Sequence, residues 1–204
     1  MSSPLAPGAS ALTTAFAFAA DSAAPSLADG AKVPMLEQSS LLLRPCPAGE
    51  GPALRRVGIL DPLTDTILGF ASRRRARGRL AWLRSWAPPV VEVHESDDEP
   101  LVFTMRRGWG FGRRWRVEDA EGTSVGRVVG PFLLDRRERP LAVHRPQAER
   151  ASYRDTQGGE LATTEMGDEG VRLTFRPDGE GNPFVKMLLL AATLIHNETA
   201  LGGL

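Results

Sequence analysis

Two short segments that combine arginine with aromatic residues are the strongest candidates for chemistry in this sequence. One runs from Arg73 to Arg79 and is followed by two tryptophans; the other runs from Arg106 to Trp115 and alternates glycine with aromatic residues. Guanidinium groups bind phosphate oxygens through paired hydrogen bonds, and indole rings favour the headgroup level of a bilayer. These segments therefore predict contact with an anionic phospholipid surface. The candidate contact residues are Arg73, Arg74, Arg75, Arg77, Arg106, Arg107, Trp109, Phe111, Arg113 and Arg114.

Other interpretations of the same segments stay open. The first run also fits a solvated loop between strands, and the second fits a mobile hairpin loop. Nucleic acid presents the same phosphate chemistry. The formal net charge of +0 means that the molecule as a whole attracts neither nucleic acid nor acidic lipid, so only local patches could bind either. The second segment contains no G-x-G-x-x-G between a strand and a helix, so a nucleotide site is not indicated.

Patterns typical of catalysis are weak. The three histidines, His94, His144 and His196, lack the spacing of metal ligands, and the single cysteine, Cys46, excludes an intramolecular disulfide and a cysteine-cluster metal site. No G-x-S-x-G is present, and nothing in the sequence places a nucleophile beside a base. We therefore expect a non-enzymatic protein that needs no cofactor.

The segment before the C-terminal apolar stretch offers only weak metal candidates. Asp178, Glu180 and Asn182 carry oxygen side chains at alternate positions, as a hard cation requires. The distal bidentate glutamate of a complete calcium loop is missing. We therefore favour a turn whose last residue caps the following helix.

Apolar runs of strand length alternate with turn residues from Leu41 onward. The turn signals recur about every 8 to 12 residues, as in antiparallel sandwiches and barrels. Three units repeat a strand, an Asp-led turn and an apolar residue followed by a small one, at Asp61–Gly69, Asp119–Gly126 and Asp155–Ala162. No amphipathic helix separates the strands, as a βαβ fold would require. The pattern predicts an antiparallel, meander-like, mainly β domain.

One helix is expected, over residues 183–197. Asn182 suits the N-cap and Pro183 the first helical position, and the residues from Phe184 to Ile195 are apolar around nearly the whole axis. Such a helix must be buried. Its apolar stretch spans about 18 Å, which is short of the roughly 30 Å of a bilayer core. We therefore predict a closed barrel of about twelve strands around this central helix.

Two parts of the chain resemble the tubby C-terminal-like group, which includes phospholipid scramblases and LURP-one-related proteins. One part is Val93–Val129, with "PLVFTMRR" and "RWRVEDAEGTSVGRVVG"; the other is "NPFVKMLLLAATLIHN" at 182–197, similar to the closing helix of the scramblases. The likeness covers roughly Leu41 to Asn197 and implies a twelve-stranded barrel around a C-terminal helix. The chain departs from the scramblases because it lacks their cysteine-rich palmitoylation cluster and a complete calcium segment.

The chain is expected to have two parts. Residues 1–37 are rich in Ala, Ser and Pro and contain no basic residue before Lys32, so they predict a disordered tail rather than a secretory signal. Residues 38–204 form the barrel domain. We expect a monomeric, cytoplasmic module, peripheral at the membrane, that binds an anionic phospholipid surface or a protein partner. The alternatives are scramblase-like lipid transport and a regulatory or DNA-binding module.

Overall fold

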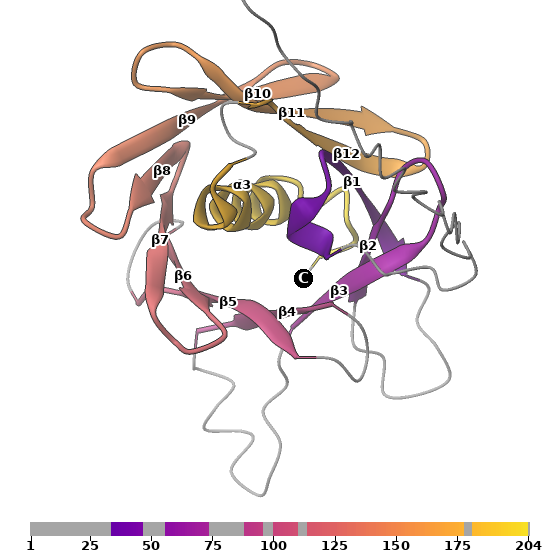
Figure 1. The fold of residues 1–204 in the computed structure, drawn as a ribbon, viewed down its shortest axis with the longest axis horizontal. Coiled ribbons are helices and arrows are strands. Elements are labelled where there is room, and N and C mark those ends of the chain that lie inside the picture. The colour runs from indigo at the N-terminus through magenta and orange to yellow at the C-terminus, as the bar shows by residue number, and fades with distance from the viewer. Residues whose placement is uncertain are drawn as a thin grey trace, which may run out of the picture. The chain divides into compact units, whose positions relative to one another are not determined.

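The computed structural model describes residues 34–46, 56–73, 88–95, 100–109, 114–177 and 181–203. Within these residues, twelve antiparallel strands form a closed barrel, in which each strand pairs with its sequence neighbours and β1 pairs with β12. Helix α3, Pro183–His196, runs through the interior (Figure 1). The predicted fold, a closed antiparallel barrel around a C-terminal helix, is confirmed.

The strands follow one another in an up-and-down meander. Their bounds are β1 Ser40–Cys46, β2 Arg56–Leu60, β3 Ile67–Arg73, β4 Val90–His94, β5 Leu101–Arg107, β6 Arg114–Asp119, β7 Ser124–Val129, β8 Phe132–Asp135, β9 Pro140–Pro146, β10 Arg150–Asp155, β11 Glu160–Gly167 and β12 Gly170–Phe175. A short 3-10 helix, η1 (Met35–Glu37), precedes β1.

Alternate connections of this meander lie at the same end of the barrel. One end of the barrel, which we call the entry end, carries the β2–β3, β6–β7, β8–β9 and β10–β11 turns and the first turn of α3. The opposite end, which we call the exit end, carries the β7–β8 turn and the last turn of α3, where His196 Nε2 lies 2.9 Å from the carbonyl oxygen of Gly130. Strands β3 and β5 end at the exit end and β4 and β6 begin there, so the described parts of the two arginine-rich segments, Arg73, residues 106–109 and residues 114–115, lie at that end.

The helix is the centre of the core, as predicted. Residues 188–195 of α3 are all buried, and Leu190 has no exposed surface. The helix approaches β7 closely at Gly126, where a Cβ atom would lie 2.9 Å from Leu188 Cδ1 and would also collide with the carbonyl oxygen of Leu134. Asn182 Oδ1 accepts a hydrogen bond from the Phe184 amide at 3.0 Å, so the predicted N-cap is confirmed.

Asp-led turns close four of the hairpins. In each, the first aspartate (Asp61, Asp119, Asp135 or Asp155) accepts a hydrogen bond on Oδ1 from a backbone N–H two or four residues later. Three of them were predicted from the repeat; the Asp135 turn was not. The Asp135 turn carries Glu138 at φ 61° in the position where the turns after Asp119 and Asp155 carry glycine. Because this glycine is missing, the sequence pattern does not indicate a turn there.

The barrel domain begins earlier than residue 38. Residues 34–37, placed in the tail by sequence, include η1, whose Met35 is 1% exposed and belongs to the core. The neighbouring Gln38 carbonyl accepts a hydrogen bond from Lys186 Nζ at 2.8 Å, and this ammonium lies 5.0 Å from the centre of the Phe175 ring. Met35 is followed by Leu36, which packs against the same core, and two adjacent apolar residues are too few to give a periodic signal, so the sequence pattern left them in the tail.

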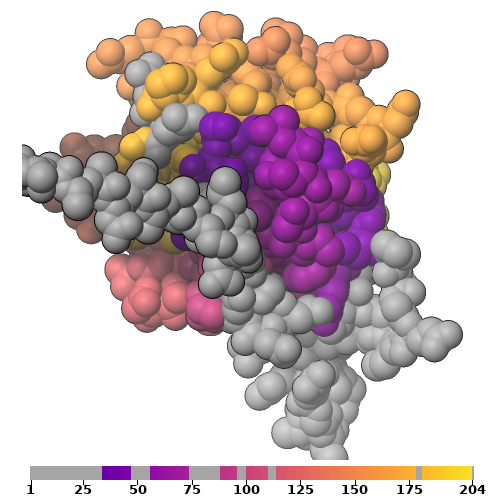
Figure 2. All heavy atoms as spheres, turned by 45° about the vertical axis from the view of Figure 1, so that its right-hand side comes forward, coloured from indigo at the N-terminus to yellow at the C-terminus, as the bar shows by residue number. Residues whose placement is uncertain are grey.

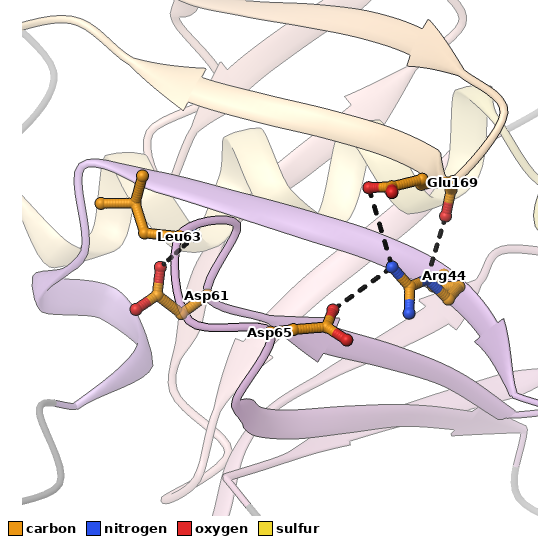
Figure 3. A network of polar contacts seen from close by, with 5 residues as sticks. All are labelled: Arg44, Asp61, Leu63, Asp65 and Glu169. Carbon is orange, nitrogen blue, oxygen red and sulfur yellow. Dashed lines mark hydrogen bonds and ion pairs between the residues drawn. The ribbon is translucent and has the colours of Figure 1, made fainter.

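The seam between the first and last strands is closed by both backbone and side chains. In the space-filling view, indigo and purple residues of the first strands lie directly beneath the orange residues of the last ones (Figure 2). Arg44 of β1 reaches to both sides (Figure 3): Nε donates to the Glu169 carbonyl at 3.1 Å, and Nη2 lies 3.3 Å from Asp65 Oδ1. Arg44 therefore links the β11–β12 turn to the β2–β3 turn across β1.

Candidate functional site

Three arginines form a row across adjacent strands on the outer face of the barrel. Arg106 of β5 lies opposite Arg116 of β6, which lies opposite Arg127 of β7. Their sequence neighbours Met105, Val117 and Val128 are buried in the core, so the arginines point outward. Strands of a sheet lie about 4.8 Å apart, so the arginine row concentrates positive charge along one line. Like charges directly opposite one another destabilise a sheet pair, and this row therefore needs compensation.

Two carboxylates supply part of that compensation. Glu118 lies between two members of the row, with Oε2 at 3.0 Å from Arg106 Nε and Oε1 at 3.1 Å from Arg116 Nε. Glu138 Oε1 lies 2.7 Å from Arg127 Nη1. The two carboxylates thus compensate only two of the three arginines in the row. Arg114 of β6 adds a further positive charge. The outer face of β5–β7 therefore keeps a local excess of positive charge although the whole chain is neutral.

A pocket of about 480 Å³ lies over this face. Arg114, Arg116 and Arg127 line it together with Val129 and Leu134. Trp109, which follows β5 and is 79% exposed, lines the pocket on the exit side. The pocket combines guanidinium groups, which bind phosphate, with an exposed indole and aliphatic side chains. These are the contacts that an anionic amphipathic surface requires.

The structure brings some of the predicted contact residues together. Arg106, Arg107, Trp109 and Arg114 lie at or next to the exit ends of β5 and β6. Arg73 is exposed at the exit end of β3, and β4 separates it from β5. Five predicted residues lie outside the described part of the chain: Arg74, Arg75, Arg77, Phe111 and Arg113.

Sequence reasoning missed Arg116 and Arg127. Both lie outside the arginine-rich runs, and only the strand register places them beside Arg106. The alternation Arg114–Arg116 in "RWRVED" was a usable signal, because residues two apart on a strand share a face.

The weak metal candidates gain no support from the described residues. The side chain of Asn182 is engaged as the helix N-cap, and Asp178 and Glu180 lie outside the described residues. The described part of the chain contains no group of three or more His, Cys, Asp or Glu side chains placed to hold a metal ion.

A partly buried polar cluster lies inside the barrel at the exit end, and sequence reasoning missed it as well. His144 of β9 stacks on His196 of α3, and the Tyr153 hydroxyl lies 3.2 Å from Thr193 Oγ1 and 3.4 Å from His196 Nδ1. Burial, and then the charge of His196, lower the pKa of His144 to about 4. Burial also raises the pKa of Tyr153. His144 and Tyr153 are therefore neutral at pH 7, and the cluster ties the helix to β9 and β10.

The fold and the site together define a class: a twelve-stranded antiparallel barrel that encloses its own C-terminal helix and carries a row of arginines on its outer face. No family model matches the chain, and no curated protein or solved structure matches it either. Among the helices of the described residues, none has the length and apolar character needed to cross a membrane.

Proposed function

We propose that this protein is a non-catalytic, tubby-like or LURP-one-related module that binds an anionic membrane surface. The observation that carries the proposal is the arginine row Arg106–Arg116–Arg127 beside the exposed indole of Trp109. Under this proposal the module is cytoplasmic and peripheral, because the cytoplasmic leaflet is the one that carries anionic lipid.

The energetics favour a reversible surface contact. Each basic residue near an anionic membrane contributes about 1 kcal/mol. Arg107 and Arg114 add two charges beside the row, and no described carboxylate forms an ion pair with either of them. A total of a few kcal/mol gives binding that salt weakens, because exposed charges are screened over about 8 Å at physiological ionic strength. Trp109 adds an interfacial anchor that salt does not screen.

The same observations rank the alternatives. Lipid transport between leaflets needs a polar route through hydrocarbon, whereas α3 is sealed among apolar side chains such as Leu189 and Leu190. Surface binding therefore fits the barrel without rearrangement, and transport does not. A protein partner with an acidic face, or a nucleic-acid backbone, would use the same arginines. The membrane is favoured because Trp109, Val129 and Leu134 place apolar groups among the charges.

Vesicle flotation tests this proposal. The full chain is mixed with phosphatidylcholine vesicles, with or without phosphatidylserine, at low and at physiological salt. We expect flotation only with phosphatidylserine, and less of it as salt rises. Equal flotation with both vesicle types, or none with either, contradicts the proposal. A duplex DNA competitor that displaces the protein at a lower concentration than the vesicles would favour the nucleic-acid alternative.

A further inference from the structure

A second pocket, at the entry end of the barrel, is separate from the arginine row. It has a volume of about 410 Å³ and lies between the first turns of α3 and the adjacent β6–β7 and β8–β9 turns. This volume falls in the range of about 300–1,000 Å³ that is typical of small-molecule sites.

The inner wall of this pocket is apolar. Val125 and Leu188 belong to the buried core, and Leu141 and Val185 pack against that core while lining the pocket. Phe184, the second residue of the helix, lines it too and is 50% exposed. Burying apolar surface contributes about 25 cal/mol per Å², so a hydrocarbon group that covers this wall would bind favourably.

The rim is basic. Arg136, Arg137 and Arg139 come from the single β8–β9 turn, and all three are exposed. The Asp135 carboxylate at their base is already occupied: Oδ1 accepts the backbone N–H groups of Arg137 at 2.7 Å and Arg139 at 2.9 Å, and Oδ2 lies 3.6 Å from Arg139 Nε. The backbone hydrogen bond from Arg139 lowers the pKa of Asp135 most, and the one from Arg137 lowers it further. The Asp135 carboxylate therefore stays ionised and holds the turn in shape.

The remaining charge at the rim suits one external anion. The other acidic lining residue, Asp119, accepts the Thr123 amide at 2.6 Å within its own turn. In the described part of the chain, Arg139 is the one rim arginine that forms an ion pair with a carboxylate. Arg136 and Arg137 are therefore left to face a ligand, and a guanidinium binds a carboxylate through two parallel hydrogen bonds.

We propose that this entry pocket binds a single-chain anionic amphiphile, a long-chain carboxylate. Its hydrocarbon chain lies along Phe184, Val185 and Leu141, and its carboxylate contacts Arg136 and Arg137. The site uses no residue of the arginine row, so ligand binding in this pocket can be tested independently of membrane binding.

Isothermal titration of the full chain with dodecanoate, kept below its micelle concentration, tests the proposal. Two further probes separate the contributions: dodecanol has the chain without the charge, and acetate has the charge without the chain. We expect saturable one-to-one binding of dodecanoate and at least tenfold weaker binding of both other probes. A tenfold loss corresponds to about 1.4 kcal/mol, which one charge-assisted contact supplies.

Two variants localise the binding. Replacing both Arg136 and Arg137 by glutamine should weaken dodecanoate binding about tenfold or more and leave dodecanol binding unchanged. Phe184→Gln should weaken the binding of both dodecanoate and dodecanol. The matched control replaces Arg150 and Arg154 of β10 by glutamine, which removes the same charge elsewhere, and should leave binding unchanged.

Three outcomes would overturn the proposal. The first is the absence of saturable binding. The second is dodecanol binding as tightly as dodecanoate, which would make the site purely apolar. The third is an equal loss in the control variant, which would make the contact a general charge effect. All variants change exposed or half-exposed side chains, and a cooperative melt at the parent temperature verifies that each is folded.

Discussion

The imidazole rings of His144 and His196 stack face to face, with centroids 4.0 Å apart and ring planes 14° from parallel. They come from β9 and α3, and the stack fixes the last turn of the central helix against the barrel wall. Two protonated rings at this distance would repel one another in a partly buried site. The contact therefore makes the stability of the barrel depend on pH.

Stability should fall as the pH drops from about 6.5 to about 4. The pKa of His144 is about 4 in the folded state, because burial and the charge of His196 disfavour its protonation, whereas an unperturbed histidine has a pKa of 6.5. Between these values the unfolded chain binds more protons, so acid favours unfolding. Because His144 is only partly buried, we expect a loss of about 1–2 kcal/mol, measured by urea denaturation across this pH range.

His144→Gln provides the control for this titration. Glutamine does not ionise, so this variant should lose most of the pH dependence between pH 4 and 6.5. If the variant and the parent lose stability in parallel, the acid sensitivity arises from a group other than His144. Asp61 and Asp135, whose pKa values are lowered by turn hydrogen bonds, contribute only at lower pH.

Leu190→Asp tests whether α3 is the core of the barrel. Leu190 has no exposed surface, and an unpaired carboxylate there would cost several kcal/mol. We expect loss of cooperative thermal unfolding by circular dichroism. Leu190→Met, of similar volume, is the control and should cost less than about 1.5 kcal/mol. A Leu190→Asp protein that melts like the parent would contradict the buried helix.

Gly126→Val tests the close crossing of α3 and β7. The added side chain would meet the Leu134 carbonyl and Leu188, so the helix or the β7–β8 pair must shift. Overpacking of this kind costs about 1–3 kcal/mol. The control is Gly167→Val at the end of β11, where a Cβ meets nothing within 4 Å. Equal denaturation midpoints for the two variants would show that the crossing tolerates a side chain.

Gly158→Ala tests the shared geometry of the Asp-led turns. Gly158 has φ 91°, and no atom lies within 4 Å of the position that a Cβ would take, so the substitution changes backbone strain alone. We expect a loss of about 1 kcal/mol, because L-residues resist the left-handed region. Gly122→Ala, at φ 80° in the β6–β7 turn, should cost about the same. No change in either variant would mean that these turns readily adopt another conformation.

The sequence was sufficient to predict the architecture because its signals are local. The Asp-led turns, the N-cap at Asn182 and the all-round apolar helix each act within a few residues. The relationships that give the surface its chemistry are not local. Arg106, Arg116 and Arg127 become neighbours only through the register of three strands, and His144 meets His196 only after the barrel closes around the helix. Register depends on the whole pattern of burial, so neither cluster could be predicted from spacing.

Membrane binding by the arginine row is tested by comparing two triple variants in the flotation assay with phosphatidylserine vesicles. The site variant removes three charges from the pocket over the arginine row, with the substitutions Arg114→Gln, Arg116→Gln and Arg127→Gln. The control variant removes three charges from the outer side of β10–β12, with the substitutions Arg150→Gln, Arg172→Gln and Arg176→Gln.

Both variants have the same net charge, so only the position of the lost arginines differs. At about 1 kcal/mol for each arginine near the membrane, the site variant should bind at least about a hundredfold more weakly. The control should bind like the parent, and both should remain folded. Equal binding by the two variants would show that the arginine row does not contact the membrane.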